Sequence, residues 1–130
     1  MDWFIDEAPK RWTLPVELEL LVRQAKELPY MEAHRLLFDM VPQDEFMKLW
    51  KEVLQHKRSK RKQFTKHLIV ELEQTNSQGF TGTLTIHQTN QPDDYYYMAD
   101  VRRIKIRETS KWRFWTRALL IVEAAKSAGW

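Results

Sequence analysis

The amino-acid sequence predicts an α+β fold, in which an N-terminal three-helix segment is followed by a three-stranded antiparallel meander covered by a C-terminal amphipathic helix. Apolar residues recur at helical spacing up to about residue 55, alternate with polar residues from residue 68, and return to helical spacing after residue 110. A chain of 130 residues has the length of one domain. We therefore expect 1–130 to form a single domain, with a helical half at about 13–62 and a β-meander plus helix at about 66–128.

The first helix is expected to begin after Thr13, which suits an N-cap, with Pro15 in its first turn. One face carries the apolar residues Leu18, Leu21, Val22, Ala25 and Leu28. Val16 and Leu20 lie on the other side, so we expect this helix to be buried on two sides. The preceding residues 1–12 contain bulky side chains that are expected to pack on the core, with a partner-binding peptide as the alternative: Trp3, Phe4, Ile5 and Trp12.

Two further helices are expected before residue 62. The second covers Met31–Met40 and ends before Pro42, because a residue that precedes proline disfavours helical geometry. Asp44 is the expected cap of the third helix. Its apolar stripe consists of Phe46, Met47, Leu49, Trp50, Val53 and Leu54. The third helix is expected to run into the basic residues that follow, which complement the negative end of the helix dipole.

The second half of the chain has the period of β-strands. Leu68, Val70 and Leu72 alternate with polar residues, and residues 80–87 repeat this pattern after the turn sequence at 76–79. A second turn at 90–94 leads to a third strand within Tyr95–Arg107. Its alternation slips between Val101 and Ile104, which predicts a bulge or a short helical insert.

The last predicted element is a helix from about Ser110 to Ser127, with Ser110 as its N-cap. Its apolar residues span about half of the circumference, which is typical of a helix that covers a sheet. They are Trp112, Trp115, Ala118, Leu119, Ile121, Val122 and Ala125. The polar side is expected to hold Arg113, Thr116, Arg117, Glu123 and Ser127.

Composition excludes several classes of protein. The chain has no cysteine, which rules out disulfides, thiolate metal sites and a cysteine nucleophile. Its first residues are acidic and lack the basic and apolar regions of a signal peptide. The most apolar run, Ala118–Val122, is too short to cross a bilayer. We therefore expect a soluble, cytoplasmic protein without a membrane partner.

The net charge of +3 hides a strongly uneven distribution. The net charge is −4 over residues 1–50, +6 over 51–67, −5 over 68–100 and +6 over 101–130. Five of the six residues Lys57–Lys62 are cationic. Such a run binds phosphates with a strong dependence on salt, because each contact releases condensed counterions. The alternative is a solvated helix end with an exit loop that keeps the protein soluble.

A second basic cluster begins at residue 102. On an extended strand Arg103, Lys105 and Arg107 point to one side and the isoleucines between them to the other. The threonines at positions 81, 83 and 85 share that side if the register permits, and hydroxyl and guanidinium groups suit phosphate contacts. Alternatively, Glu71 and Glu73 pair with the cations across the strands and neutralise them.

The sequence does not predict an enzyme, a metal or a cofactor. The strongest catalytic alternative is a metal-dependent nuclease built on Asp93, Asp94, Asp100 and Lys105. It is weakened because Arg103 occupies the position where a carboxylate is wanted. The four histidines show no metal-ligand spacing, and no nucleophile motif or glycine-rich phosphate loop is present.

The leading hypothesis is a small nucleic-acid-binding accessory or regulatory protein that makes largely sequence-independent contacts to DNA or RNA phosphates. The expected contact residues are Lys57, Arg58, Lys60, Arg61, Lys62, Lys66, Arg103, Lys105, Arg107, Arg113 and Arg117. The alternative is a non-enzymatic protein-interaction module, such as a complex subunit, adaptor or inhibitor, that docks an acidic partner. A homodimer is compatible with either function.

Overall fold

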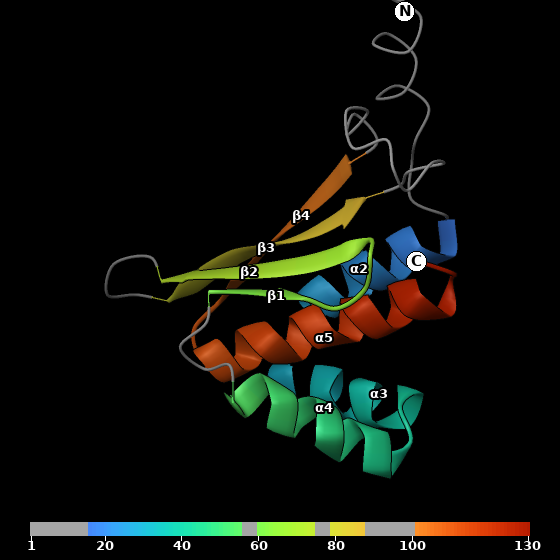
Figure 1. Cartoon of the computed structure of the whole chain (residues 1–130). Helices are drawn as coiled ribbons and strands as arrows, with labels where there is room; N and C mark the ends of the chain where they lie inside the picture. The colour runs from blue at the N-terminus through green and yellow to red at the C-terminus, as the bar shows by residue number, and fades with distance from the viewer. Residues whose placement is uncertain (1–15, 56–59, 75–78, 88–100) are drawn as a thin grey trace, which may run out of the picture.

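The computed structural model describes residues 16–55, 60–74, 79–87 and 101–130, and it confirms the α+β class (Figure 1). The helices are α2 (Val16–Glu27), α3 (Tyr30–Met40), α4 (Gln43–Gln55) and α5 (Lys111–Ser127). The strands are β1 (Arg61–Gln63), β2 (Leu68–Gln74), β3 (Phe80–His87) and β4 (Val101–Glu108). The aromatic lead-in, the helix start at Thr13 and both predicted turns lie outside the described residues, apart from Gly79.

Within the described residues the sheet has four antiparallel strands in the order β1-β2-β3-β4, one more than the sequence predicts. The additional strand is β1, which pairs with β2 from Arg61↔Glu71 to Gln63↔Ile69. The sequence predicts a cationic helix end at these residues, but α4 ends at Gln55. Charged residues are typical of short edge strands, because charge discourages pairing with another chain. Because of this charged composition, the sequence pattern did not predict β1 as a strand.

The predicted bulge or short helical insert between Val101 and Ile104 is wrong, because β4 pairs with β3 without interruption from Phe80↔Glu108 to His87↔Val101. Arg102 causes the break in alternation, since it is the partner of Ile86 and takes a position on the core side. Its Nη2 lies 3.9 Å from Oε1 of Glu19 on α2. A charged residue therefore occupies an inward position at the end of the sheet, where a carboxylate meets it.

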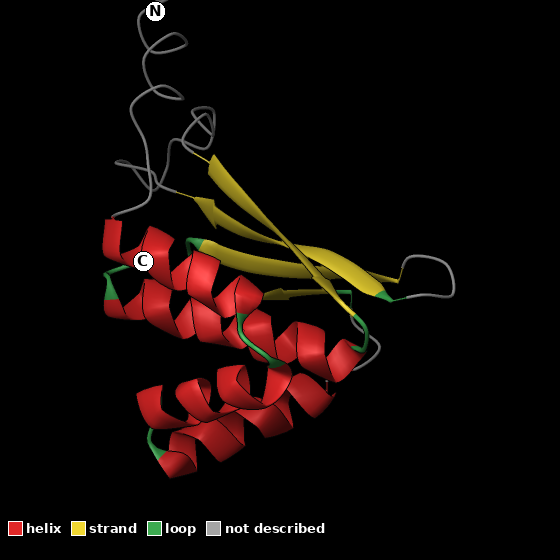
Figure 2. Cartoon of the chain, turned by 180° about the vertical axis from the view of Figure 1, so that it is seen from behind, coloured by secondary structure: helices red, strands yellow, loops and turns green. Residues whose placement is uncertain are grey.

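Helix α5 lies at the centre of the molecule, between the sheet on one side and α3 on the other, with α2 alongside it (Figures 1 and 2). Its start is as predicted, since the Ser110 hydroxyl accepts a hydrogen bond of 3.2 Å from the Arg113 amide. The predicted polar side is wrong in part, because Thr116 and Arg117 are buried. The sequence pattern predicts that α5 covers a sheet with one face, whereas α2 and α3 also pack against it.

One hydrophobic cluster joins the helical half to the β-meander. The strands contribute the alternating residues that the sequence predicts: Leu68, Val70, Leu72, Leu84, Ile86, Ile104 and Ile106. Leu18, Val22 and Ala25 bury one face of α2. Val16 and Leu20 are 72% and 57% exposed, so the described residues do not bury this helix on two sides as expected.

Aromatic side chains join α3 to α4. The Phe46 ring meets the rings of His34 and Phe38 edge-on, with centroid separations of 5.4 and 4.9 Å. Phe46 and Val53 are the buried members of the predicted apolar stripe of α4. Its remaining members are either half-buried (Leu49 and Trp50) or exposed (Met47 and Leu54). Helix α4 begins at Gln43, so Asp44 lies in its first turn and not before it as expected.

Candidate nucleic-acid interface

The outer face of the sheet brings three cations and three threonines together. The register pairs Thr81 with Arg107, Thr83 with Lys105 and Thr85 with Arg103. Paired residues share a face, and the intervening residues Leu84, Ile104 and Ile106 are buried. The three cations are exposed and the three threonines half-buried. Helices α2 to α5 lie on the opposite side (Figures 1 and 2).

The glutamates of β2 share this outer face but do not neutralise the cations. Glu71 pairs with Thr83, and Glu73 pairs with Thr81, so a column of threonines separates the acidic strand from the basic one. Two strand spacings, about 10 Å, separate the backbones of these strands, and no ion pair between them is found among the described residues. Among the described residues, the ion pair of Glu71 is with Arg61 on β1, with 4.0 Å between Oε1 and Nε. On the outer face, the acidic side chains of β2 and the basic side chains of β4 are therefore separated by the threonines of β3.

The two basic clusters lie at opposite edges of the sheet. Strands β1 and β4 form the two edges, and the threonine and glutamate columns lie between them. Lys60, Arg61 and Lys66 are exposed on the β1 side. Lys57 and Arg58 lie outside the described residues. The described members of the two clusters therefore flank the face and do not merge into one patch.

Two of the expected contact residues direct their charged groups towards the helical side of the sheet. The side chain of Lys62 points to the helical side, where it is 11% exposed and its Nζ lies 2.8 Å from Glu52 Oε1 on α4. Arg117 is buried and donates to the backbone oxygens of Ala25 and Leu28 at the end of α2. It also forms an ion pair with Glu108 of β4. The structure does not bring either side chain to the outer face.

Arg113 and Arg117 differ although both belong to α5. Arg113 is exposed, with its guanidinium 5.4 Å from the centre of the Tyr30 ring and a 3.0 Å hydrogen bond to the Thr109 hydroxyl. Burial lowers the pKa of the Arg117 guanidinium from its usual value. An arginine pKa begins so high that this group stays charged at neutral pH. Arg117 is therefore a buried charge that joins three elements.

A basic hollow of about 340 Å³ lies beside edge strand β4. Its lining residues come from three elements: Lys26 of α2, Lys105, Ile106 and Arg107 of β4, and Arg117 of α5. The sequence analysis missed Lys26. Its only signal was a cation in the last turn of a helix, which the helix dipole explains without any ligand.

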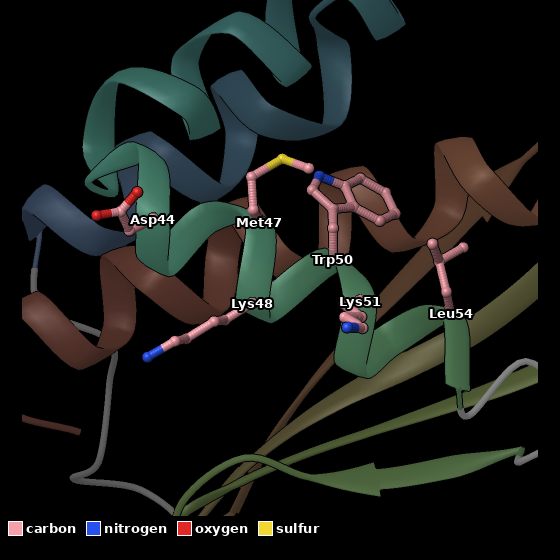
Figure 3. A pocket seen from close by; sticks show the side chains of 6 residues that line it. All are labelled: Asp44, Met47, Lys48, Trp50, Lys51 and Leu54. Carbon is pink, nitrogen blue, oxygen red and sulfur yellow. The ribbon is translucent and has the colours of Figure 1, made fainter.

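A second hollow, of about 580 Å³, lies on the outer side of α4 (Figure 3). Met47, Trp50 and Leu54 project from successive turns of the helix there. Met47 and Leu54 are 58% and 45% exposed, which is high for apolar side chains at regular helical spacing. Lys48 and Lys51 also line the hollow, with Asp44 at the start of the helix. This surface is apolar with a cationic margin.

The described residues contain no group of three or more histidine, aspartate or glutamate side chains that could hold a metal ion. Asp93, Asp94 and Asp100 of the nuclease hypothesis lie outside those residues. None of the described helices has the length and apolar character needed to cross a membrane. Comparison with family models, with curated proteins and with solved structures finds no significant match to this chain.

Proposed function

We propose that this chain is a small nucleic-acid-binding accessory or regulatory protein that contacts phosphates through Arg103, Lys105 and Arg107. The observation that carries the proposal is the β3–β4 register, which aligns these cations with a column of hydroxyl groups on the outer face. No carboxylate of the described residues forms an ion pair with them. Phosphate contacts of this kind position a protein on a strand without reading its sequence.

The length of the basic row suits a nucleic-acid strand. Alternate residues of a β-strand repeat at about 6.7 Å, so the three cations span about 13 Å. That is the axial rise of about four nucleotides in one strand of a duplex. Lys60 and Lys66 add charge at the other edge of the sheet. Binding through such contacts is largely sequence-independent and weakens steeply with salt.

The test replaces all three β4 cations with glutamine and measures affinity for single-stranded and duplex oligonucleotides. Three lost phosphate contacts lower the affinity about 100-fold at 0.1 M salt, from a slope of about −0.7 per contact on single strands. The matched control removes three exposed cations from α3 and α4, Arg35, Lys48 and Lys51, and keeps wild-type affinity. Equal losses in both triple variants, or none in either, contradict the proposal.

The α4 hollow favours a second candidate function, the docking of an acidic amphipathic helix from a protein partner. The exposed Met47 and Leu54, with the half-buried Trp50 between them, have the spacing that accepts the apolar face of a helix. Lys48 and Lys51 complement carboxylates along the edges of that helix. This candidate uses a different surface from the three cations Arg103, Lys105 and Arg107 (the β4 row), so substitutions can test the two functions separately.

A synthetic helical peptide with leucine on one face and glutamate elsewhere is the probe for this candidate. We expect its backbone-amide shifts in NMR titration to map to α4, and the double substitution Lys48→Glu and Lys51→Glu to weaken binding at least about tenfold. The control peptide carries lysine in place of glutamate. If both peptides bind alike, or neither binds, the surface is not an acidic-helix site.

A further inference from the structure

We propose that the hollow beside β4 binds the terminal phosphate monoester of a nucleic-acid strand. This inference rests on the proposed function and adds the chemical group that one end of the site selects. The hollow of about 340 Å³ is near the lower limit for ligand pockets, a size that suits a phosphate with its attached sugar.

Contacts at two places hold α2 against the edge of the sheet and so place Lys26 beside β4. Arg102 and Glu19 lie 3.9 Å apart at one end of the strand. At the other end of the strand, Arg117 donates hydrogen bonds to the backbone oxygens of Ala25 and Leu28 and forms an ion pair with Glu108. Lys26 lies in the last turn of α2 between these ties. The hollow is therefore built from elements that are fixed to one another, as a binding site requires.

The charge of the hollow is not compensated within the described residues. Lys26, Lys105 and Arg107 have no carboxylate within ion-pairing distance there, whereas Lys62, Arg102 and Lys126 each have one. Arg117 occupies the nearby negative groups, namely Glu108 and the carbonyl oxygens at the end of α2. Three like charges around one hollow repel one another, and a bound anion relieves that repulsion.

The number of cations favours a terminal phosphate over an internal one. A phosphate monoester carries close to two negative charges at neutral pH, since its second pKa is about 6. Each internal phosphodiester carries a single charge. Arg107 offers the planar fork that binds two phosphate oxygens, and the lysines supply point charges. Arg117 and Ile106 line the side towards the core, so the ligand enters as a chain end.

The test compares oligonucleotides that are identical except for a 5′-phosphate, a 3′-phosphate or hydroxyl groups at both ends. At pH 7.5 we expect one phosphorylated form to bind about tenfold more tightly than the hydroxyl form, as for one added charge-assisted contact. Lys26→Met abolishes this difference. Arg103→Met, on the outer face, lowers the affinity for all three forms alike. Arg35→Met, on α3, is the matched control for loss of one exposed cation.

Lowering the pH to 5 provides a readout that a merely structural role of Lys26 would not move. The terminal phosphate then loses its second charge, so the tenfold preference shrinks while binding of the hydroxyl form is retained.

Equal binding of phosphorylated and hydroxyl forms at pH 7.5 overturns the inference and leaves the proposed function standing. If inorganic phosphate shifts the amides of Lys26 and residues 105–107 but no oligonucleotide binds, the proposed function fails and the strand-end assignment fails with it. If inorganic phosphate binds as tightly as the phosphorylated strand, the ligand is a small phosphate and the strand-end assignment is likewise wrong.

Discussion

At the scale of the residue, Arg117 is a buried cation that holds three elements together. Its guanidinium joins α5 to the end of α2 and to the last residue of β4. The side chains of Arg117 and Glu108 are 9% and 10% exposed, so neither charge is well solvated once its partner is removed. An unpaired buried charge is costly even where the intact pair contributes little net stability.

We expect Arg117→Met to lower the free energy of unfolding by about 3 kcal/mol, because Glu108 is left buried without its partner. Urea denaturation at pH 7 measures this loss. The double variant Arg117→Met with Glu108→Leu regains part of it, since the orphaned carboxylate is then gone. A double variant as unstable as the sum of the two single variants would show that the pair is not coupled.

Strand parity predicted the outward direction of Arg103, Lys105 and Arg107, because a β-strand alternates its side chains whatever surrounds it. Helical periodicity did not predict the burial of Arg117. It placed that residue on the polar side of the last helix, which is a solvent side only if nothing else packs there. Lys26 was not predicted for a related reason, because no pattern in the sequence of α2 indicates that β4 lies beside the last turn of that helix.

At the scale of the element, long periodic segments were predicted well and short charged ones were not. The helices α3, α4 and α5 and the strands β2 and β3 follow their sequence patterns to within a few residues. β1 was missed because its three residues carry no apolar alternation, and its hydrogen bonds depend on β2. The supposed bulge in β4 arose because Arg102 holds a core-side position through a contact with α2, which is a tertiary effect.

Gly82 shows how closely the sheet and the central helix approach. A side chain at this position would meet the backbone oxygen of Glu71 and the ring of Phe114. The absence of a Cβ lets the Phe114 ring of α5 pack directly on the strand, which sets the distance between the two layers. The sequence predicts a glycine on the apolar face of a strand. It does not predict the Phe114 ring, which leaves no room for a side chain at this position.

At the scale of the whole molecule, the two positive charge blocks of the sequence supply the strands at the two edges of the sheet. The positive blocks at 51–67 and 101–130 supply β1 and β4 at opposite edges, and the negative block at 68–100 contributes the glutamates of β2. The sequence located the charges, but only the strand order shows that the basic clusters flank the outer face. The apolar hollow on α4 belongs to a separate layer of helices, away from the charged face (Figure 1).

The central claim is that the β4 row binds phosphates, and the salt dependence of binding tests it most directly. Each phosphate contact to a single strand contributes about −0.7 to the slope of log K against log salt concentration. Replacing Arg103, Lys105 and Arg107 with glutamine should therefore make the slope shallower by about 2, while the Arg35, Lys48 and Lys51 control keeps the wild-type slope. An unchanged slope in the β4 variant would contradict the claim, whatever the affinity.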